Sequence, residues 1–248
     1  MTDILARYPK TRPPLPAAHR AIHERHYVAN RTAAYRTTAL SSRLEGWMHR
    51  RVADDVRTGG PAATLEIGAG TLNHLRHEPR SAPYDIVEPF ARLYAEAPAL
   101  GRIRQAYSAI DDVPADRRYP RIVSIATFEH LEDLPAVVAR ACLLLEAGGC
   151  LRVGIPNEGT ILWRLGTLIT GAEFRLRYGL DYGSLMRHEH VNTADEIEAV
   201  LGCFFATTRT AVCGLGRRLA LYRFLECRRP DRDRAASLLA ARAARTAA

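Results

Sequence analysis

The chain has 248 residues, of which 47% are hydrophobic and 25% are charged, proportions that are ordinary for a folded domain with a full core. The formal net charge is +8, but the 35 basic residues are 34 arginines and Lys10, and no compact basic run contains interleaved aromatic residues. Nucleic-acid binding is therefore not indicated, whereas an anionic substrate such as a phosphate-bearing one is compatible with this charge.

The cysteines and the apolar runs bear on the compartment. The five cysteines are scattered without C-x-x-C spacing, which is typical of small core residues in a reducing compartment. No apolar run approaches the length of a transmembrane helix, and residues 1–16 hold charges and prolines where a signal peptide would be apolar. We therefore expect a cytoplasmic protein without a membrane span. Nothing in the sequence indicates its oligomeric state.

The first 58 residues are expected to form an N-terminal helical extension. Residues 1–16 contain Pro9 and a Pro13-Pro14-Leu15-Pro16 run, which favours an irregular or polyproline-like lead-in over a helix. From Ala17 to about Thr58 the pattern becomes helical. Apolar residues then recur near a period of 3.6, which predicts one amphipathic helix: Leu40, Leu44, Trp47, Met48, Val52 and Val56.

The most informative stretch runs from Ala63 to Asn73. Apolar residues up to Ile67 predict a short buried strand, and Gly68-Ala69-Gly70 then permits a tight turn and close approach to a ligand. A helix after this turn would direct its free N–H groups at that ligand. A dinucleotide fingerprint requires a third glycine where the chain has Asn73, so the pattern departs from that of an NAD site.

Two acids mark the ends of neighbouring predicted strands. Glu66 precedes the first glycine by two residues, where a carboxylate would repel a pyrophosphate but suits a cofactor that carries an ammonium group. Tyr84-Asp85-Ile86-Val87-Glu88 is a second short strand that ends in an acid, and Glu88 is placed to accept both ribose hydroxyls. The two acids together favour S-adenosylmethionine (SAM) over NAD.

On these residues the chain resembles the class I, Rossmann-like SAM-dependent methyltransferases over roughly residues 64–227. The E/D-x-G-x-G motif of that family matches Glu66, Gly68 and Gly70, and its ribose-binding acid matches Glu88. The resemblance implies an α/β fold with a doubly wound, mostly parallel seven-stranded sheet, N-terminal helices and a lid insertion after strand five. It also implies a cofactor site that we assign as follows: Glu66, Gly68, Ala69, Gly70, Glu88, Pro89, Ser108, Ile110 and Ala126.

Several of these assignments follow from later elements. Residues 103–110 are the third strand candidate, and family members often place an adenine-binding acid after it, where this chain has Ser108 or Ala109. Residues 121–127 are the fourth strand and lead into Glu129-His130, which resembles the family's E-H…P signature. Residues 150–157 form the fifth strand and match the family's ending in Pro-Asn. We also expect helices over residues 90–97 and 137–145.

The rest of the chain divides into an insertion, a closing hairpin and a tail. Residues 158–192 are predicted to be an acceptor lid, with an apolar helix near 161–169 and an aromatic and basic run after it. Thr193-Ala194-Asp195-Glu196 has capping-box spacing and begins another helix. Residues 204–212 and 218–227 read as the last two strands. The predicted boundaries are an extension at 1–58, a SAM-binding domain at 59–229 and a tail at 230–248.

Histidines at two places are candidates for catalysis. An alcohol acceptor must lose a proton during methyl transfer, and histidine suits this role near neutral pH. His130 and His190 are therefore predicted to be catalytic. Asn157, Tyr182, His188 and Asn192 are predicted to bind substrate, and their polarity favours a hydroxylated acceptor. His19, His23, His26, Tyr27 and Tyr35 would lie on or near the N-terminal lid, although ordinary surface positions explain each of them as well.

A divalent metal is a further option that we do not favour. Some relatives, the ubiquinone-pathway O-methyltransferases and the small-RNA 2′-O-methyltransferases, hold an ion with E-x-x-E-H and a later histidine. Here Glu129 and His130 match, but Ala126 replaces the first acid. Glu129, His130 and either His188 or His190 could still form a three-ligand site, and we take His190 as the third candidate ligand.

The sequence thus predicts a SAM-dependent methyltransferase that acts on a hydroxyl of a small or medium-sized polar metabolite, such as a sugar or a glycan end. The alternatives are an N-methyltransferase, a nucleic-acid methyltransferase, an NAD-dependent oxidoreductase and a non-catalytic protein with this fold. The acceptor itself is not identified by any residue pattern.

Overall fold

The computed structural model describes residues 3–20, 22 and 39–246. Its centre is a seven-stranded sheet in the order β3-β2-β1-β4-β5-β7-β6. The strands are β1 (Thr64–Ile67), β2 (Tyr84–Val87), β3 (Gln105–Tyr107), β4 (Tyr119–Ile125), β5 (Leu145–Pro156), β6 (Phe205–Gly214) and β7 (Ala220–Pro230). The sheet confirms the predicted doubly wound architecture, because the chain moves outward from β1 first through β2 and β3 and then through β4 and β5.

The carboxyl ends of the parallel strands meet at one edge of the sheet. Strands β1 to β5 are parallel, and β7 enters antiparallel between β5 and β6 as the predicted hairpin. All four residues of β1 are buried. The carboxyl end of β1 lies between those of its neighbours, since Ile67 pairs with Val87 on one side and with Ser124 on the other. This is the point where the strand order reverses, and ligands collect there in open α/β sheets.

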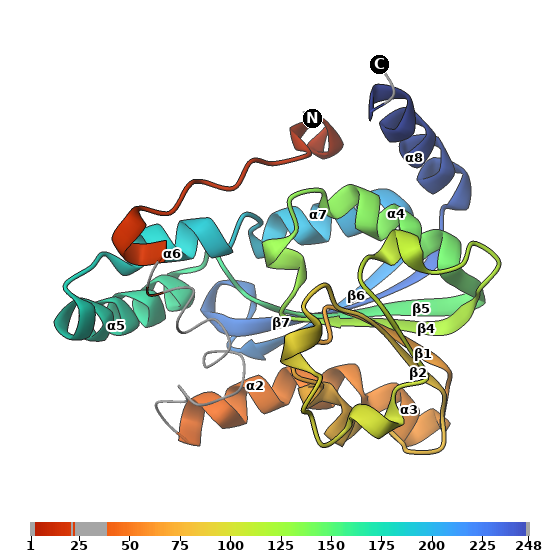
Figure 1. The fold of residues 1–248 in the computed structure, drawn as a ribbon, viewed down its shortest axis with the longest axis horizontal. Helices are drawn as coiled ribbons and strands as arrows, with labels where there is room; N and C mark the ends of the chain where they lie inside the picture. Colours follow the sequence, from red (N-terminus) through yellow and green to blue (C-terminus); the bar gives the residue numbers. More distant parts are fainter. Residues whose placement is uncertain (1–2, 21, 23–38, 247–248) are drawn as a thin grey trace.

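Helices cover both faces of the sheet (Figure 1). On one side Met48 and Val52 pack against Val123, Ile125 and Phe224. On the other side lies the main core cluster, to which three helices contribute buried residues such as Val138, Ile197 and Ala235. The helices are α2 (Ala39–Val52), α3 (Asp54–Gly59), α4 (Leu134–Leu144), α5 (Ile161–Tyr178), α6 (Tyr182–Glu189), α7 (Ala194–Phe204) and α8 (Arg232–Thr246).

The N-terminal region differs from its prediction at two points. A one-turn 3-10 helix, η1 (Ile4–Arg7), forms inside the segment expected to be irregular, because the Asp3 carboxylate accepts a hydrogen bond from the Leu5 N–H. The single helix expected up to residue 58 is interrupted at Ala53, between α2 and α3. The predicted lid residues His23, His26, Tyr27 and Tyr35 lie outside the described residues.

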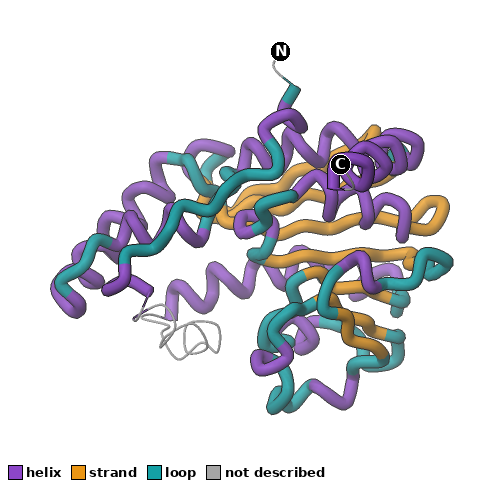
Figure 2. Tube along the Cα trace, turned by 45° about the horizontal axis from the view of Figure 1, so that its top comes forward, coloured by secondary structure: helices purple, strands orange, loops and turns teal. Residues whose placement is uncertain are grey.

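The lead-in after η1 is fixed to the helical layer (Figures 1 and 2). The Tyr8 hydroxyl donates to Asn192 Oδ1 at 2.9 Å, and Lys10 Nζ donates to Glu196 Oε2 at 2.8 Å. Arg12 donates to the carbonyl oxygens of His188 and His130. Residues near the start of the chain therefore hold the segments that carry the candidate histidines.

Connections on the β1–β3 side are shorter than predicted. The glycine turn leads into a 3-10 helix, in the segment where a short helix or a loop was expected, and Leu72 has a left-handed φ of 61° directly before it. The helix predicted over residues 90–97 is reduced to one 3-10 turn, and the strand predicted over 103–110 to three residues. The 3-10 segments of this and later regions are η2 (Asn73–His77), η3 (Ala91–Leu93), η4 (Leu100–Arg102), η5 (Ile110–Asp112), η6 (Phe128–His130) and η7 (Arg217–Leu219).

The elements after β5 follow the prediction more closely. The capping box at Thr193 and Glu196 forms and begins α7. The predicted apolar helix becomes α5, which continues nine residues further than expected, to Tyr178, and α6 follows it within residues 158–192. The arginine-rich tail forms α8, although the domain boundaries themselves stay predictions. None of the helices in the described part of the chain is both long enough and apolar enough to cross a membrane.

Candidate functional site

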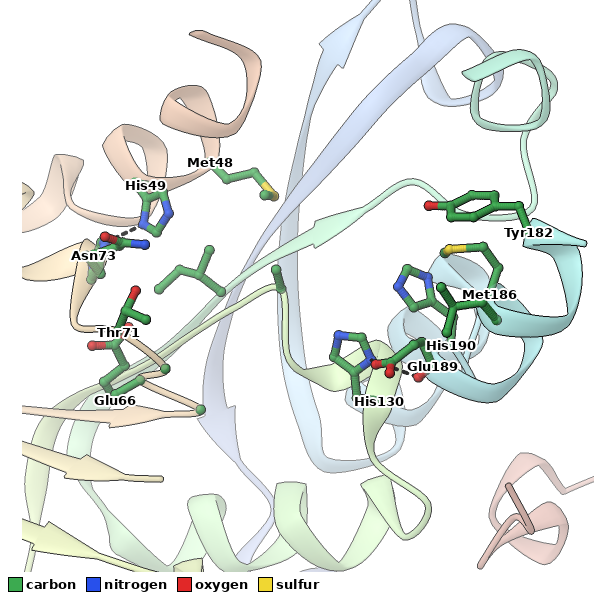
Figure 3. Close-up of a pocket in the computed structure, with 17 residues that line it drawn as sticks. Met48, His49, Glu66, Thr71, Asn73, His130, Tyr182, Met186, Glu189 and His190 are labelled. Carbon is green, nitrogen blue, oxygen red and sulfur yellow. Dashed lines mark hydrogen bonds and ion pairs between the residues drawn. The ribbon is translucent and has the colours of Figure 1, made fainter. Parts of the chain in front are cut away.

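A cavity of about 340 Å³ opens at the carboxyl edge of the sheet (Figure 3). One end is formed by the β1–η2 turn and α2, and the opposite end by η6 and α6. The predicted site residues that line it are Glu66, Gly68, Ala69, Gly70, Ala126, His130, Tyr182 and His190. The structure therefore brings predicted cofactor residues and predicted catalytic residues into a single space.

The turn requires glycine for two reasons, its backbone conformation and the close approach of Thr127. Gly68 has a φ of 75° and Gly70 a φ of 51°, both in the left-handed region that glycine adopts without a steric penalty. The Gly68 N–H donates to the Val87 carbonyl at 2.8 Å, which ties the turn to β2. A Cβ on Gly68 would lie 2.2 Å from Thr127 Oγ1, so the turn could not approach the end of β4 with any other residue.

Glu66 places a buried carboxyl group in the cavity. Its side chain is 2% exposed, and Oε2 accepts a hydrogen bond from the Tyr84 hydroxyl at 3.0 Å. Burial raises the pKa of Glu66 to about 8, because a charged carboxylate is poorly solvated there. A cation in the cavity would reverse this effect, so the residue fits a ligand that carries an ammonium group.

Glu88 organises the turn from outside the cavity lining. Its Oε2 accepts from the Gly70 N–H at 2.8 Å, and its Oε1 accepts from the Phe90 N–H at 3.1 Å. Each carboxylate oxygen has two acceptor sites, so these contacts leave capacity for ribose hydroxyls. Pro89 and Ser108 are exposed, Ile110 is buried, and none of these three lines the cavity.

His130 is oriented by a backbone carbonyl. It lies at the end of η6, and its Nδ1 is 2.7 Å from the Glu189 carbonyl oxygen. A carbonyl only accepts, so Nδ1 donates and the neutral ring keeps Nε2 as an acceptor. The ring of His130 meets that of His190 edge to face, with centroids 4.9 Å apart.

His190 is held by a carboxylate directly after α6. Its Nδ1 donates to Glu158 Oε2 at 2.5 Å, and its ring stacks near Trp163 with centroids 6.1 Å apart. Burial opposes a positive charge on this ring. The hydrogen bond to Glu158 and the charges of Glu129, Glu158 and Glu189 outweigh that effect, so the pKa of His190 is raised.

Three of the predicted substrate residues lie elsewhere. Asn157 is fully buried, and its amide donates to the carbonyls of Arg217 and Ala220 while its oxygen accepts from Arg223. Asn192 is 1% exposed and bonds the carbonyls of Phe128 and Leu131.

His188 points away from the cavity, toward the lead-in, with Nδ1 2.7 Å from the Pro13 carbonyl oxygen. These three side chains hold backbone around the site and do not line this cavity, so their assignment to substrate binding stays a prediction. Of the four predicted substrate residues, only Tyr182 lines it.

Sequence reasoning missed several residues of the site. Met48 and His49 of α2 line the cavity beside the glycine turn, together with Thr71 and Asn73. His49 Nδ1 lies 3.1 Å from Nδ1 of His74, a buried ring whose pKa is lowered by burial. The sequence did offer a signal for Met48 and His49: both lie in the predicted amphipathic helix, and Met48 is on the face that packs against the sheet.

Glu158 was missed for a different reason. It follows the predicted Pro-Asn ending of strand five directly, and an acid at that strand end was a usable signal. Glu189 also lines the cavity, but only the histidines on either side of it in the sequence were predicted as site residues.

Glu129, His130 and His190 meet the geometric requirement for an ion. Each of the three offers a ligand atom, and these atoms lie within 4.8 Å of one another. Each imidazole uses Nδ1 for a protein oxygen, and Nε2 of His130 lies 3.9 Å from Glu129 Oε1. A divalent cation remains a less favoured alternative because Ala126 supplies no further carboxylate.

Structural comparison assigns the fold. NodS, an N-methyltransferase from Bradyrhizobium japonicum WM9 solved with S-adenosyl-L-homocysteine, superposes with a TM-score of 0.53 at 16% identity, covering 74% of this chain and 86% of NodS. The chain has the class I methyltransferase fold. The plantazolicin methyltransferase BamL, solved with a triazolic desmethylPZN analogue and S-adenosyl-L-homocysteine, gives a TM-score of 0.56 at 12% identity over 83% of this chain and 91% of BamL.

A third structure shows how widely the fold is used. An O-methyltransferase family protein from Burkholderia thailandensis gives a TM-score of 0.52 at 18% identity, covering 91% of this chain and 66% of that protein. No protein-family model and no curated protein sequence matches this chain. Since the similar structures include N- and O-methyltransferases, the fold leaves the acceptor atom to be argued from the site.

Proposed function

We propose that the protein is a SAM-dependent methyltransferase that methylates a hydroxyl of a small or medium-sized polar metabolite, such as a sugar or a glycan end. One observation carries this proposal. The same cavity is lined by Glu66 and the glycine turn at one end and by His130 and His190 at the other. A methyl donor bound at the first end would face an acceptor bound at the second.

The donor end fits SAM in its charge and shape. Glu66 would accept hydrogen bonds from the ammonium group of the cofactor, and Glu88 would accept them from the ribose. Glu88 already holds the glycine turn, because the Gly70 N–H donates to its Oε2. An anionic pyrophosphate would not stabilise the charged form of Glu66, whereas the ammonium group of SAM would, which counts against an NAD-dependent oxidoreductase.

The acceptor end fits removal of a proton from a hydroxyl. SAM supplies a methyl group that is already activated on a sulfonium, so the protein must position the acceptor behind it. His190 would take the hydroxyl proton on Nε2, and Glu158 would stabilise the resulting imidazolium through Nδ1. His130 Nε2 faces the same space and would orient the hydroxyl.

An N-methyltransferase would use the same donor end. An amine acceptor needs little help from a base, so it would not require the Glu158–His190 pair. The imidazole of His190, held by the Glu158 carboxylate with His130 beside it, favours a hydroxyl. Retained activity after loss of both histidines would favour an amine.

Calorimetry and activity assays with histidine variants test the proposal in two steps. We expect the protein to bind SAM and not NAD, and Glu66→Gln to weaken SAM binding about tenfold or more, since a charged hydrogen bond is lost. Glu146→Gln is the matched control because Glu146 is exposed on β5.

Methyl transfer from labelled SAM into fractions of cell extract would then supply an acceptor. We expect His190→Ala to lower turnover about a hundredfold or more, as is usual for a general base. His188→Ala should have little effect because that ring faces the lead-in. Failure to bind SAM would refute the proposal.

A further inference from the structure

A second and larger hollow adjoins the catalytic cavity. It is a groove of about 1000 Å³ between α5 and α6, and Tyr182 and Met186 line both spaces. In Figure 3 these two side chains lie beside His190 at the far end of the cavity from Glu66. Glu158 lines the groove while its partner His190 lines the cavity. The groove therefore leads directly to the proposed base.

The wall that α5 contributes is apolar and open to solvent. Leu168 and Leu176 line the groove at 70% and 90% exposure, and Ala172 lies midway between them at a spacing of four residues. Trp163 adds an aromatic ring near the His190 end. Contiguous exposed apolar surface of this kind usually marks a binding site.

Unpaired cations accompany this apolar wall. Arg164 and Arg175 line the groove, and among the described residues no carboxylate forms an ion pair with either. They are eleven residues apart, which is three helical turns, so they lie on one face of α5 about 16 Å apart. The two acids of the groove are engaged, since Glu158 holds His190 and Asp181 caps α6.

We propose that this groove binds an aliphatic chain attached to the polar, hydroxyl-bearing end of the methyl acceptor, and that this chain carries an anionic group such as a phosphate or a carboxylate. The inference rests on the proposed function and extends it. The hydroxyl-bearing end of the acceptor reaches His130 and His190, the chain lies along Leu168 and Ala172, and the anion pairs with Arg175.

Two other occupants fit less well. A two-fold dimer through α5 would bring the arginines of both copies together, and like charges across an interface are unfavourable. A membrane surface is flat, whereas this apolar wall forms a groove with α6 and continues into the cavity. Sedimentation would detect the dimer, and vesicle binding would detect the membrane contact.

The test uses decyl phosphate below its micelle concentration, with decyl maltoside and inorganic phosphate as partial probes. Binding is followed by calorimetry on the full chain with S-adenosyl-L-homocysteine present, and separate titration of that compound reports the donor end. We expect decyl phosphate to bind and inorganic phosphate not to bind measurably. Leu168→Glu should weaken decyl phosphate about tenfold or more.

Arg175→Gln should weaken decyl phosphate about fivefold or more while leaving decyl maltoside unchanged, because only the charge contact is lost. Leu100→Glu is the matched control, since Leu100 is 39% exposed in η4, outside the groove lining. None of these variants should alter binding of S-adenosyl-L-homocysteine.

Three results would overturn the inference. The first is equal affinity of the wild type and Leu168→Glu for decyl phosphate, or no binding by either while S-adenosyl-L-homocysteine still binds. The second is a dimer in sedimentation that Leu168→Glu dissociates, which would make α5 a subunit interface. The third is binding to anionic vesicles without binding to monomeric decyl phosphate. Loss of S-adenosyl-L-homocysteine binding in the wild type would instead refute the proposed function.

Discussion

Individual side chains in this site owe their properties to neighbours far away in the sequence. Glu66 is a strand residue whose carboxyl group is buried beside Tyr84, and Glu158 is a loop acid that meets His190 across 32 residues. Burial dominates the first case and raises a carboxyl pKa, whereas charge pairing dominates the second and raises an imidazole pKa. In the proposed function, one cavity thus holds an acid that would meet a cation and a base that would take a proton.

Cofactor binding should depend on pH through Glu66. Its pKa is about 8 without a ligand, and a nearby ammonium group would lower it, so binding below pH 8 requires loss of a proton. We expect affinity for S-adenosyl-L-homocysteine to rise by up to about tenfold per pH unit towards pH 8 and to fall above it as the ligand's amino group loses its own proton. Calorimetry across this range measures it, and Glu66→Gln should remove the rise. A flat profile in the wild type would contradict this role.

Activity should depend on pH through His190. The base works only when Nε2 is unprotonated, so the rate should rise as pH passes the raised pKa of this ring. In Glu158→Gln that limb should move to lower pH, and maximal turnover should fall about tenfold or more because the imidazolium loses its partner. Glu173→Gln, an exposed acid on α5, is the control. If the rise of the rate with pH stayed at the same pH in Glu158→Gln, the general base would be a residue other than His190.

Metal removal should have little effect on turnover. The cluster of Glu129, His130 and His190 offers only three ligands, and Ala126 stands where a further acid would complete it. We expect dialysis against a chelator to leave the rate within about twofold, since the proposed proton transfer needs only the imidazole. Loss of activity that Mg²⁺ or Mn²⁺ restores would show instead that these residues hold an ion.

At the scale of elements, the glycine turn is the least replaceable part of the fold. Gly68 combines a φ of 75° with a Cβ position 2.2 Å from Thr127, whereas Gly70 has a φ of 51° and no atom within 4 Å of its Cβ position. Gly68→Ala should therefore destabilise the protein by about 3 kcal/mol, and Gly70→Ala by about 1 kcal/mol. Urea unfolding measures both, with Gly202→Ala in open space on α7 as the control. Equal losses for the two turn variants would contradict the steric argument.

The elements that sequence predicted well are those with strong local signals. The buried runs of β1, β2, β4 and β5 and the capping box of α7 were read correctly because their residues alone favour those structures. The connection η3 was predicted as a longer helix, since nothing local reports the turns after Phe90, whereas η2 lies in a segment expected to be a short helix or a loop. Asn157 and Glu158 are consecutive, and only the carbonyls of Arg217 and Ala220 decide that Asn157 turns inward.

At the scale of the whole molecule, the reversal of strand order places the proposed donor end and the proposed acceptor end in one cavity. Strands β1 and β4 end side by side, α2 supplies one wall, and α6 supplies the opposite one. The lead-in from the start of the chain holds the acceptor side, because Arg12 bonds the backbone of His130 and His188. Sequence alone predicted the sheet and the donor end, while the acceptor end required segments around residues 10, 130, 158 and 190 to be brought together.

A crystal structure of the complex with S-adenosyl-L-homocysteine tests the central claim most directly. We expect the amino group of the ligand within hydrogen-bond distance of Glu66, its ribose hydroxyls on Glu88, and its sulfur directed along the cavity toward His130 and His190. A ligand bound at any other edge of the sheet, or with its amino group remote from Glu66, would contradict the account.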